Sequence, residues 1–97
     1  MLPVDFLPAA HHDFDESFDW YAERNPQAAM QFANAVDAAL SMIAASPQRF
    51  AAIDNIHRGC SINHFPFRIV YRVTTDRIVV VAVAHAKREP GYWKKRV

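Results

Sequence analysis

One stretch near the C-terminal end constrains the fold more than any other part of the chain. From Phe65 to Val73, every second residue is a large apolar one, while Arg68, Val70 and Arg72 point the other way, which is the period-two pattern of a strand with one apolar face. A short polar turn follows, and residues 78–84 are then apolar without a break, as expected of a central strand covered on both faces. The chain is therefore predicted to build a small sheet with a buried middle.

Polar, basic and aromatic residues return together where this buried strand ends. They are His85, Lys87, Arg88, Glu89, Tyr92 and Trp93. A buried strand holds the side chains at its end in fixed positions at the rim of the sheet. A working site is therefore expected first at this rim.

The N-terminal half predicts a short strand followed by two helices. Pro3 weakens the strand over residues 2–7 and places it near a sheet edge. The first helix is expected from about residue 8 to Arg24, with an apolar stripe at helical spacing. Asn25-Pro26 is a preferred pair for a helix N-cap and first helical position, so a second helix should run from there to about Ala45.

Parts of the two helix surfaces allow two interpretations. The second helix is nearly uncharged on its main stripe and also on the side with Ala35, Ala38 and Met42. This favours a helix sandwiched between the first helix and the sheet, and the alternative is a docking face for another protein's helix. Trp20 lies off the stripe of the first helix; we expect it to be covered at the flank, and the alternative is that it awaits a partner.

Three strands complete the expected sheet. Segments 56–63, 66–73 and 77–85 have short connections and should form an antiparallel meander. The predicted order is β-α-α-β-β-β. The predicted fold class is α+β, with a helical hairpin packed on one face of a small, mainly antiparallel four-stranded sheet.

Length and composition limit the class of protein. With 97 residues, of which 52% are hydrophobic, the chain is expected to be one globular domain, residues 1–97. Its single cysteine excludes an internal disulfide, and no signal peptide is recognised, so a cytoplasmic, reducing compartment is expected. No apolar run approaches the ~20 residues of a membrane span, and we expect no membrane partner.

Charge is distributed unevenly along the chain, although the net charge is only +1. Residues 1–48 carry seven acidic side chains and one basic side chain, whereas residues 49–97 carry ten basic and three acidic ones. The basic half is expected to meet something negative, such as nucleic acid or an acidic partner segment. The alternative is that the two halves neutralise each other across their packed faces.

The order and spacing of these segments resemble the RelE/ParE superfamily of toxins from bacterial type II toxin–antitoxin systems, which includes plasmid stabilisation proteins. The resemblance is carried by FPFRIVYRV at 65–73, IVVVAVAH at 78–85 and HAKREPGYW at 85–93, with weaker support from the helical segment at 25–47. It spans essentially the whole chain. It implies a small cytosolic growth inhibitor held inactive by an antitoxin encoded beside it.

The superfamily divides by target. The resemblance implies either a RelE-like toxin that cuts messenger RNA in the ribosome, or a ParE-like toxin that shares the fold and poisons DNA gyrase. RNA cleavage by the 2′-hydroxyl needs a base, cations that stabilise the crowded phosphate, and an acid for the leaving oxygen. It needs no metal if Arg or Lys supplies the charge, and we expect neither a metal site nor a cofactor.

Seven residues are the candidate site. Histidine is the side chain that ordinarily exchanges protons near neutral pH, so His85 could act as base or acid. Arg88 could bind two phosphate oxygens at once, and Tyr92 could stack on a base or transfer a proton. These three are the tentative catalytic residues if the protein is a ribonuclease. The candidates for binding a target or a phosphate are Arg58, Arg68, Trp93 and Lys94.

Each candidate also has a plainer interpretation. His85 could end a buried strand and bond locally, and Arg88 could pair with Glu89 or with the acidic helices. Tyr92 and Trp93 could form a C-terminal flap that closes the core, since large aromatic residues near a terminus usually pack. The remaining cations are then solvated charges at the rim.

Departures from the RelE pattern favour a ParE-like binding toxin. No arginine stands in residues 61–64, where the resemblance implies a catalytic one, and Tyr92 comes about two residues early. A net charge of +1 is also modest for an RNA-binding protein. A RelE-like ribonuclease and a non-toxic chromosomal relic remain the alternatives.

Overall fold

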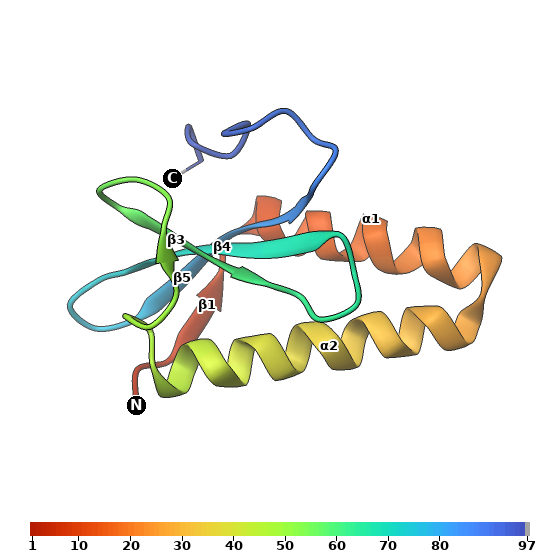
Figure 1. Cartoon of the computed structure of the whole chain (residues 1–97), viewed down its shortest axis with the longest axis horizontal. Coiled ribbons are helices and arrows are strands. Elements are labelled where there is room, and N and C mark those ends of the chain that lie inside the picture. Colours follow the sequence, from red (N-terminus) through yellow and green to blue (C-terminus); the bar gives the residue numbers. More distant parts are fainter. Residues whose placement is uncertain (97) are drawn as a thin grey trace.

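The computed structural model describes residues 1–96 as two helices laid against a five-stranded sheet (Figure 1). The elements, in chain order, are β1 (Val4–Phe6), α1 (Pro8–Arg24), α2 (Pro26–Ala45), β2 (Ala51–Ala52), β3 (His57–Ser61), β4 (Phe67–Val73) and β5 (Ile78–His85). The predicted α+β class, the helical hairpin and the order of the main elements are confirmed.

The strand order in the sheet is β1-β5-β4-β3-β2. β1 lies at one edge and is parallel to β5, while β3, β4 and β5 form the expected antiparallel meander. The predicted count of four strands is wrong by one, because Ala51–Ala52 pairs with Arg58 and Gly59 of β3. Two alanines are too few to carry a period-two pattern, so the sequence predicts only a connection there.

A β-bulge interrupts the pairing of β4 with β5. Val70 pairs with Ala82 and Tyr71 pairs with Val80, so Val81 is the extra residue on β5. A bulge bends the strand and leaves its extra residue outside the regular ladder. The Val81 carbonyl is thereby available to a side chain from another part of the molecule, and Arg96 donates to it over 3.1 Å.

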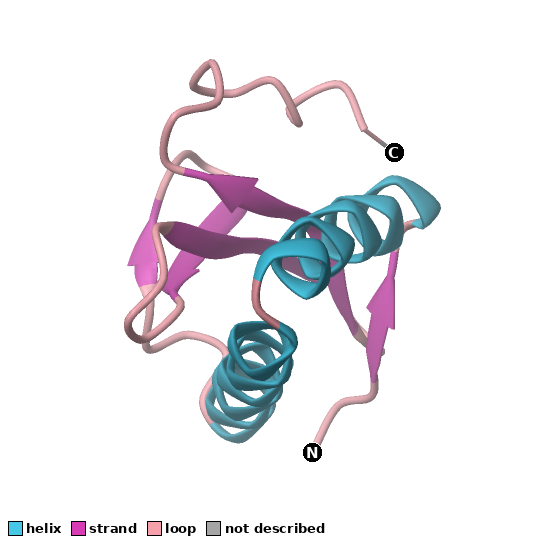
Figure 2. Ribbon diagram, turned by 90° about the vertical axis from the view of Figure 1, so that its right-hand side faces the viewer, coloured by secondary structure: helices cyan, strands magenta, loops and turns pink. Residues whose placement is uncertain are grey.

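The helical hairpin covers one face of the sheet (Figure 2). The core between the hairpin and the sheet is rich in aromatic side chains. Phe32 of α2 is fully buried, and its ring lies 5.0 Å from that of Phe67 and 5.6 Å from that of Phe14. The predicted N-cap is confirmed, since the Asn25 side chain accepts hydrogen bonds from the backbone N–H groups of residues 27 and 28. The aromatic alternation seen in the sequence therefore faces the helices.

The opposite face of the sheet is covered by the C-terminal segment, which runs across it as a loop (Figures 1 and 2). Its core consists of small residues, Val70, Val81, Ala82 and Ala84, packed with one large side chain, Trp93. Both faces of β5 are therefore buried, as its unbroken apolar run predicts.

Two surface predictions are wrong. Trp20 is 53% exposed instead of covered, and Arg24 lies over its ring with the guanidinium carbon 3.9 Å from the ring centroid. The second side of α2 is not sandwiched, because Met42 is 42% exposed and Ala38 is also exposed. The first helix and the sheet bury only the side of α2 that carries Phe32, Val36 and Ile43.

α2 is long and apolar enough to cross a membrane by length and composition alone. Phe32 and Ile43 of this helix are nonetheless fully buried against the rest of the fold. The core helix of a globular domain meets the same length and composition test.

Candidate functional site

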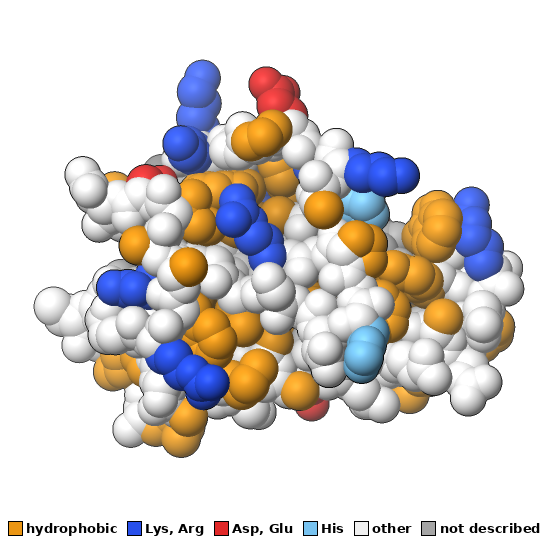
Figure 3. Space-filling model, viewed as in Figure 1, with side chains coloured by type: hydrophobic (Ala, Val, Ile, Leu, Met, Phe, Trp, Pro, Cys, Tyr) orange, Lys and Arg blue, Asp and Glu red, His pale blue; other side chains and the backbone are white. Residues whose placement is uncertain are grey.

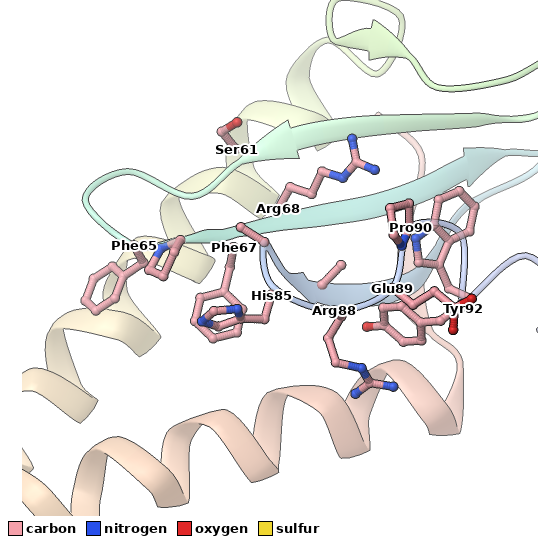
Figure 4. Close-up of a pocket in the computed structure, with 13 residues that line it drawn as sticks. Ser61, Phe65, Phe67, Arg68, His85, Arg88, Glu89, Pro90 and Tyr92 are labelled. Carbon is pink, nitrogen blue, oxygen red and sulfur yellow. The ribbon is translucent and has the colours of Figure 1, made fainter.

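A hollow of about 400 Å³ opens at the end of the sheet where β3 and β5 finish and β4 begins (Figure 4). Its walls come from these three strand ends and from the C-terminal segment. The predicted site residues found in its lining are Arg68, His85, Arg88, Tyr92 and Trp93. The expectation that the exit of β5 gathers these side chains at one rim therefore agrees with the geometry.

His85 is half-buried at the C-terminal end of β5. Its ring stands edge-on to Phe67, with 4.8 Å between the ring centroids. Its Nδ1 accepts a hydrogen bond from the backbone N–H of Lys87 over 2.9 Å. Nδ1 therefore carries no proton in the neutral ring, and Nε2 carries it. A general base needs a free lone pair, and the lone pair of this ring is already engaged by the turn.

Arg88 is exposed in the turn after β5. Its guanidinium carbon lies 4.0 Å from the centroid of the Tyr92 ring, which is a cation–π contact. Within residues 1–96 Arg88 forms no ion pair, so the salt bridge to Glu89 or the acidic helices is not observed. Its charge is available to an anionic ligand.

The hydroxyl of Tyr92 points at a buried carboxylate. It lies 3.5 Å from Oδ2 of Asp13 and donates to it. Burial and the negative charge of Asp13 raise the pKa of Tyr92 above its ordinary value of 10.0. A phenol in this environment is a weaker proton donor than a free one.

Trp93 is buried, with 1% of its surface exposed. Its ring meets that of His57, with 4.7 Å between centroids and an interplanar angle of 64°. It therefore has no open ring face on which a nucleotide could stack, and its position favours the interpretation as a flap that closes the core. Lys94 is exposed on the same segment and does not line the hollow.

The two remaining arginines lie on opposite faces of the sheet. Arg58 donates from Nη1 to the carbonyl of Phe50 over 2.7 Å and is paired in register with Tyr71, which faces the helices. Arg68 pairs with Ser61 and extends into the hollow. The structure therefore separates Arg58 from the other candidates.

Asp13 of α1 is a residue that the sequence analysis did not single out. It is 7% exposed and accepts from the backbone N–H of Val83 and from the guanidinium of Arg96, with Oδ2 distances of 3.1 and 2.7 Å. One feature of the sequence could have indicated its burial: Asp13 comes one helical turn after Ala10, which puts it on the apolar face of the helix.

An Asp54–His57 pair is the second feature that the sequence did not reveal. The Asp54 carboxylate accepts from the backbone N–H groups of Ile56 and His57, and lies 3.0 Å from Nδ1 of His57. These bonds lower the pKa of Asp54 to about 2. Nε2 of His57 is buried and has no hydrogen-bond partner within residues 1–96.

Charge on the surface follows the two halves of the sequence. Within residues 1–96, two ion pairs join the acidic half to the basic half, Arg77–Asp5 and Arg96–Asp13, each at 2.7 Å. Lys and Arg side chains predominate over Asp and Glu on the face drawn in Figure 3. Cross-neutralisation is therefore partial, and the lining of the hollow carries two arginines, Arg68 and Arg88, against one acidic residue, Glu89.

Solved structures define the class of fold. Over 90% of this chain and 98% of the other, the fold matches a chain from "Chromosomal ParDE TA system from P. aeruginosa" with a TM-score of 0.78 at 16% identity. It also matches the YoeB dimer structure from Staphylococcus aureus over 87% of this chain and 95% of the other, with a TM-score of 0.58 at 16% identity. The fold is that of the RelE/ParE-like toxins.

Sequence comparison gives the family within this class. Residues 4–90 match the family model of the ParE toxin of type II toxin–antitoxin systems. Toxin ParE2 of Mycobacterium tuberculosis, strains CDC 1551 and H37Rv, is 30% identical over 80 residues, which is 81% of this chain and 76% of the relative. The chain belongs to the ParE toxin family and is the toxin of a type II toxin–antitoxin pair. The predicted resemblance is confirmed.

Proposed function

We propose that this toxin acts in the cytoplasm and stops growth by binding DNA gyrase, without cutting RNA. The observation that carries the proposal is the state of the two proton-transfer candidates. Nδ1 of His85 is occupied by the Lys87 backbone N–H, and the Tyr92 hydroxyl is directed at Asp13. His85 therefore has no free lone pair to take a proton from a substrate in the hollow, and the Tyr92 proton is already directed at a carboxylate.

The rest of the hollow supports the same conclusion. Cleavage also needs cations on both sides of the reacting phosphate. Arg88 and Arg68 are available, but residues 61–64 hold no further arginine and Arg58 lies on the other face. The hollow is thus suited to bind an anionic group rather than to cleave one.

The cognate antitoxin is the immediate partner of a toxin in this family. We propose that its neutralising segment is acidic and apolar, because the rim of the hollow is basic and the hairpin exposes Trp20 and Met30. Such a segment would order on binding and bring carboxylates to Arg68 and Arg88.

A ribosome-dependent ribonuclease is the second candidate. It is favoured by one observation, that His85, Arg88, Tyr92 and Arg68 line the same hollow. Substrate binding would have to break the hydrogen bond at Nδ1 of His85 or use its Nε2 as a hydrogen-bond donor. The gyrase proposal requires no such rearrangement.

The two candidates are separated by expressing the toxin without antitoxin and following growth, messenger RNA ends and DNA breaks. We expect growth arrest with DNA breaks and intact transcripts. The His85→Ala variant should arrest growth as the parent does. A matched control is His12→Ala, which removes an exposed histidine from α1.

Two results would count against the proposal. Ribosome-dependent cuts that vanish in His85→Ala or Arg88→Ala would establish the ribonuclease. Normal growth at good expression would identify a non-toxic relic. Coexpression of the antitoxin should restore growth in every toxic variant that still binds it.

A further inference from the structure

The C-terminal segment, residues 86–96, is attached to the molecule at few points, and we call it the strap. The backbone N–H of Ala86 donates to the Pro66 carbonyl, and that of Arg88 donates to the carbonyl of His85 at the end of β5; these are the last backbone bonds recorded from the strap to the rest of the fold. Beyond them, the backbone bonds of the strap that the structure records are local, such as Tyr92 to Glu89 and Arg96 to Trp93. Side chains must therefore hold the strap in place.

One polar cluster holds the far end of the strap. The Arg96 guanidinium donates a hydrogen bond to each carboxylate oxygen of Asp13, from Nη1 to Oδ2 over 2.7 Å and from Nη2 to Oδ1 over 3.2 Å. Nη1 also donates to the carbonyl of Val81, the extra residue of the bulge. A forked, charge-assisted pair of this kind is strong and geometrically specific.

The same carboxylate joins three parts of the fold. Asp13 comes from α1, accepts the backbone N–H of Val83 in β5, and meets both Arg96 and Tyr92 of the strap. Because Asp13 is 7% exposed, an unpaired charge there would be costly. Arg96 is thus the counter-charge that allows this carboxylate to be buried.

The strap in turn builds the hollow. Arg88, Glu89, Pro90, Tyr92 and Trp93 form the wall that faces the strand ends (Figure 4). Trp93 is the large buried side chain among the small residues of the outer sheet face, and Tyr92 of the strap is packed against the same cluster. Without the strap, that apolar face would be open and the wall of the hollow would be lost.

We propose that Asp13 and Arg96 form a latch that closes the strap, and that they are positioning residues for the hollow through Tyr92 and Arg88. Opening the latch releases the strap while the helices and the sheet remain folded. The consequence for growth inhibition rests on the proposed function, whereas the opening itself does not.

The test uses Trp93 as a reporter. In a Trp20→Phe background Trp93 is the single tryptophan, and its quenching by acrylamide measures how far the strap has opened. We expect the quenching constant to rise severalfold in Arg96→Gln and in Asp13→Asn. The quenching constant of Arg96→Lys should lie between those of these variants and that of the parent, because a lysine ammonium keeps the positive charge but cannot form the paired hydrogen bonds of a guanidinium.

Lys95→Gln is the matched control, since it removes a neighbouring exposed cation from the same strap. Far-UV circular dichroism should be the same for all variants, and the double variant should open no further than Arg96→Gln. Quenching in Arg96→Gln and Asp13→Asn equal to that in Lys95→Gln would overturn the latch. General loss of helical signal in both would also overturn it, because the opening would then not be local.

Growth inhibition tests the positioning role. Arg96→Gln should inhibit growth at least tenfold less than Lys95→Gln at equal expression. Growth inhibition that is unchanged in spite of an open strap would overturn the positioning role while leaving the latch intact. A parent protein that does not inhibit growth would overturn the proposed function, and the quenching result would still decide the latch.

Discussion

The two faces of the sheet are covered in different ways. The inner face meets a helical hairpin through large side chains, with Phe32, Phe67 and Tyr71 all buried. The outer face meets a strap through small residues, one tryptophan and one ion pair. Apolar burial of the first kind stabilises the whole domain, whereas the second kind can be lost locally. The candidate site of the toxin therefore lies beside the face of the sheet whose cover has the lower local stability.

The largest expected effect is on the inner face. Phe32→Ala should lower the free energy of unfolding by about 3–5 kcal/mol, because it leaves a cavity among four aromatic neighbours. Urea unfolding followed by circular dichroism measures the change. Met30→Ala is the control, since Met30 is 57% exposed, and it should change the free energy by less than about 0.5 kcal/mol. A small effect of Phe32→Ala would remove the contrast between the faces.

Truncation of the large aromatic residue on the outer face should lower the free energy of unfolding by less. Trp93→Ala is expected to lower the free energy of unfolding by about 1.5–3 kcal/mol, because the strap can open instead of holding a cavity. Amide hydrogen exchange should become fast in residues 87–96 and stay slow in β4. Loss of protection throughout the sheet would show that the strap is part of the global core.

A smaller loss of stability is expected at Gly59, where the outer face is tightly packed. A Cβ placed on Gly59 would lie 3.0 Å from Cδ1 of Ile53 and 3.4 Å from Cδ of Arg68. Gly59→Ala should therefore lower the free energy of unfolding by about 1 kcal/mol, since both neighbours belong to flexible side chains that can move aside. Thermal unfolding measures it, with Ala52→Gly as a control at an exposed position of β2. A stabilised Gly59→Ala variant would contradict the packing at this point.

Acid should destabilise the protein in part through Asp54. Its pKa is lowered from 3.8 to about 2, so its contribution to stability is fully present above pH 4 and is lost as the pH falls toward 2. In Asp54→Asn the amide oxygen can still accept from the backbone, but it does not titrate. The melting temperature of the parent should thus fall more steeply than that of the variant between pH 4 and pH 2. Parallel curves would show that this carboxylate is not specially stabilised.

The sequence predicts the inner face far better than the outer one. The apolar spacing from Phe65 to Val73 predicts a strand, and Asn25-Pro26 predicts the start of a second helix. Both patterns involve residues close together in the chain, so the meander and the helical hairpin could be predicted from the sequence. The rim after β5 can also be read, because His85 and Arg88 follow directly from a buried strand.

The outer face depends on contacts between distant residues. Asp13 and Arg96 are 83 positions apart, and nothing near Asp13 shows that it will be buried under a strap. The Asp54–His57 pair and the strand Ala51–Ala52 arise in a segment without periodicity. Trp20 follows neither pattern. It is exposed in the last turns of α1, and the end of the hairpin where α1 meets α2 extends beyond the sheet (Figure 1).

The most direct test of the function uses purified gyrase, relaxed plasmid DNA and this toxin. Our account predicts gyrase-dependent DNA cleavage that needs no ribosome, persists in His85→Ala and is abolished by the cognate antitoxin. Unimpaired gyrase, together with messenger RNA cut on isolated ribosomes and spared by His85→Ala, would contradict it.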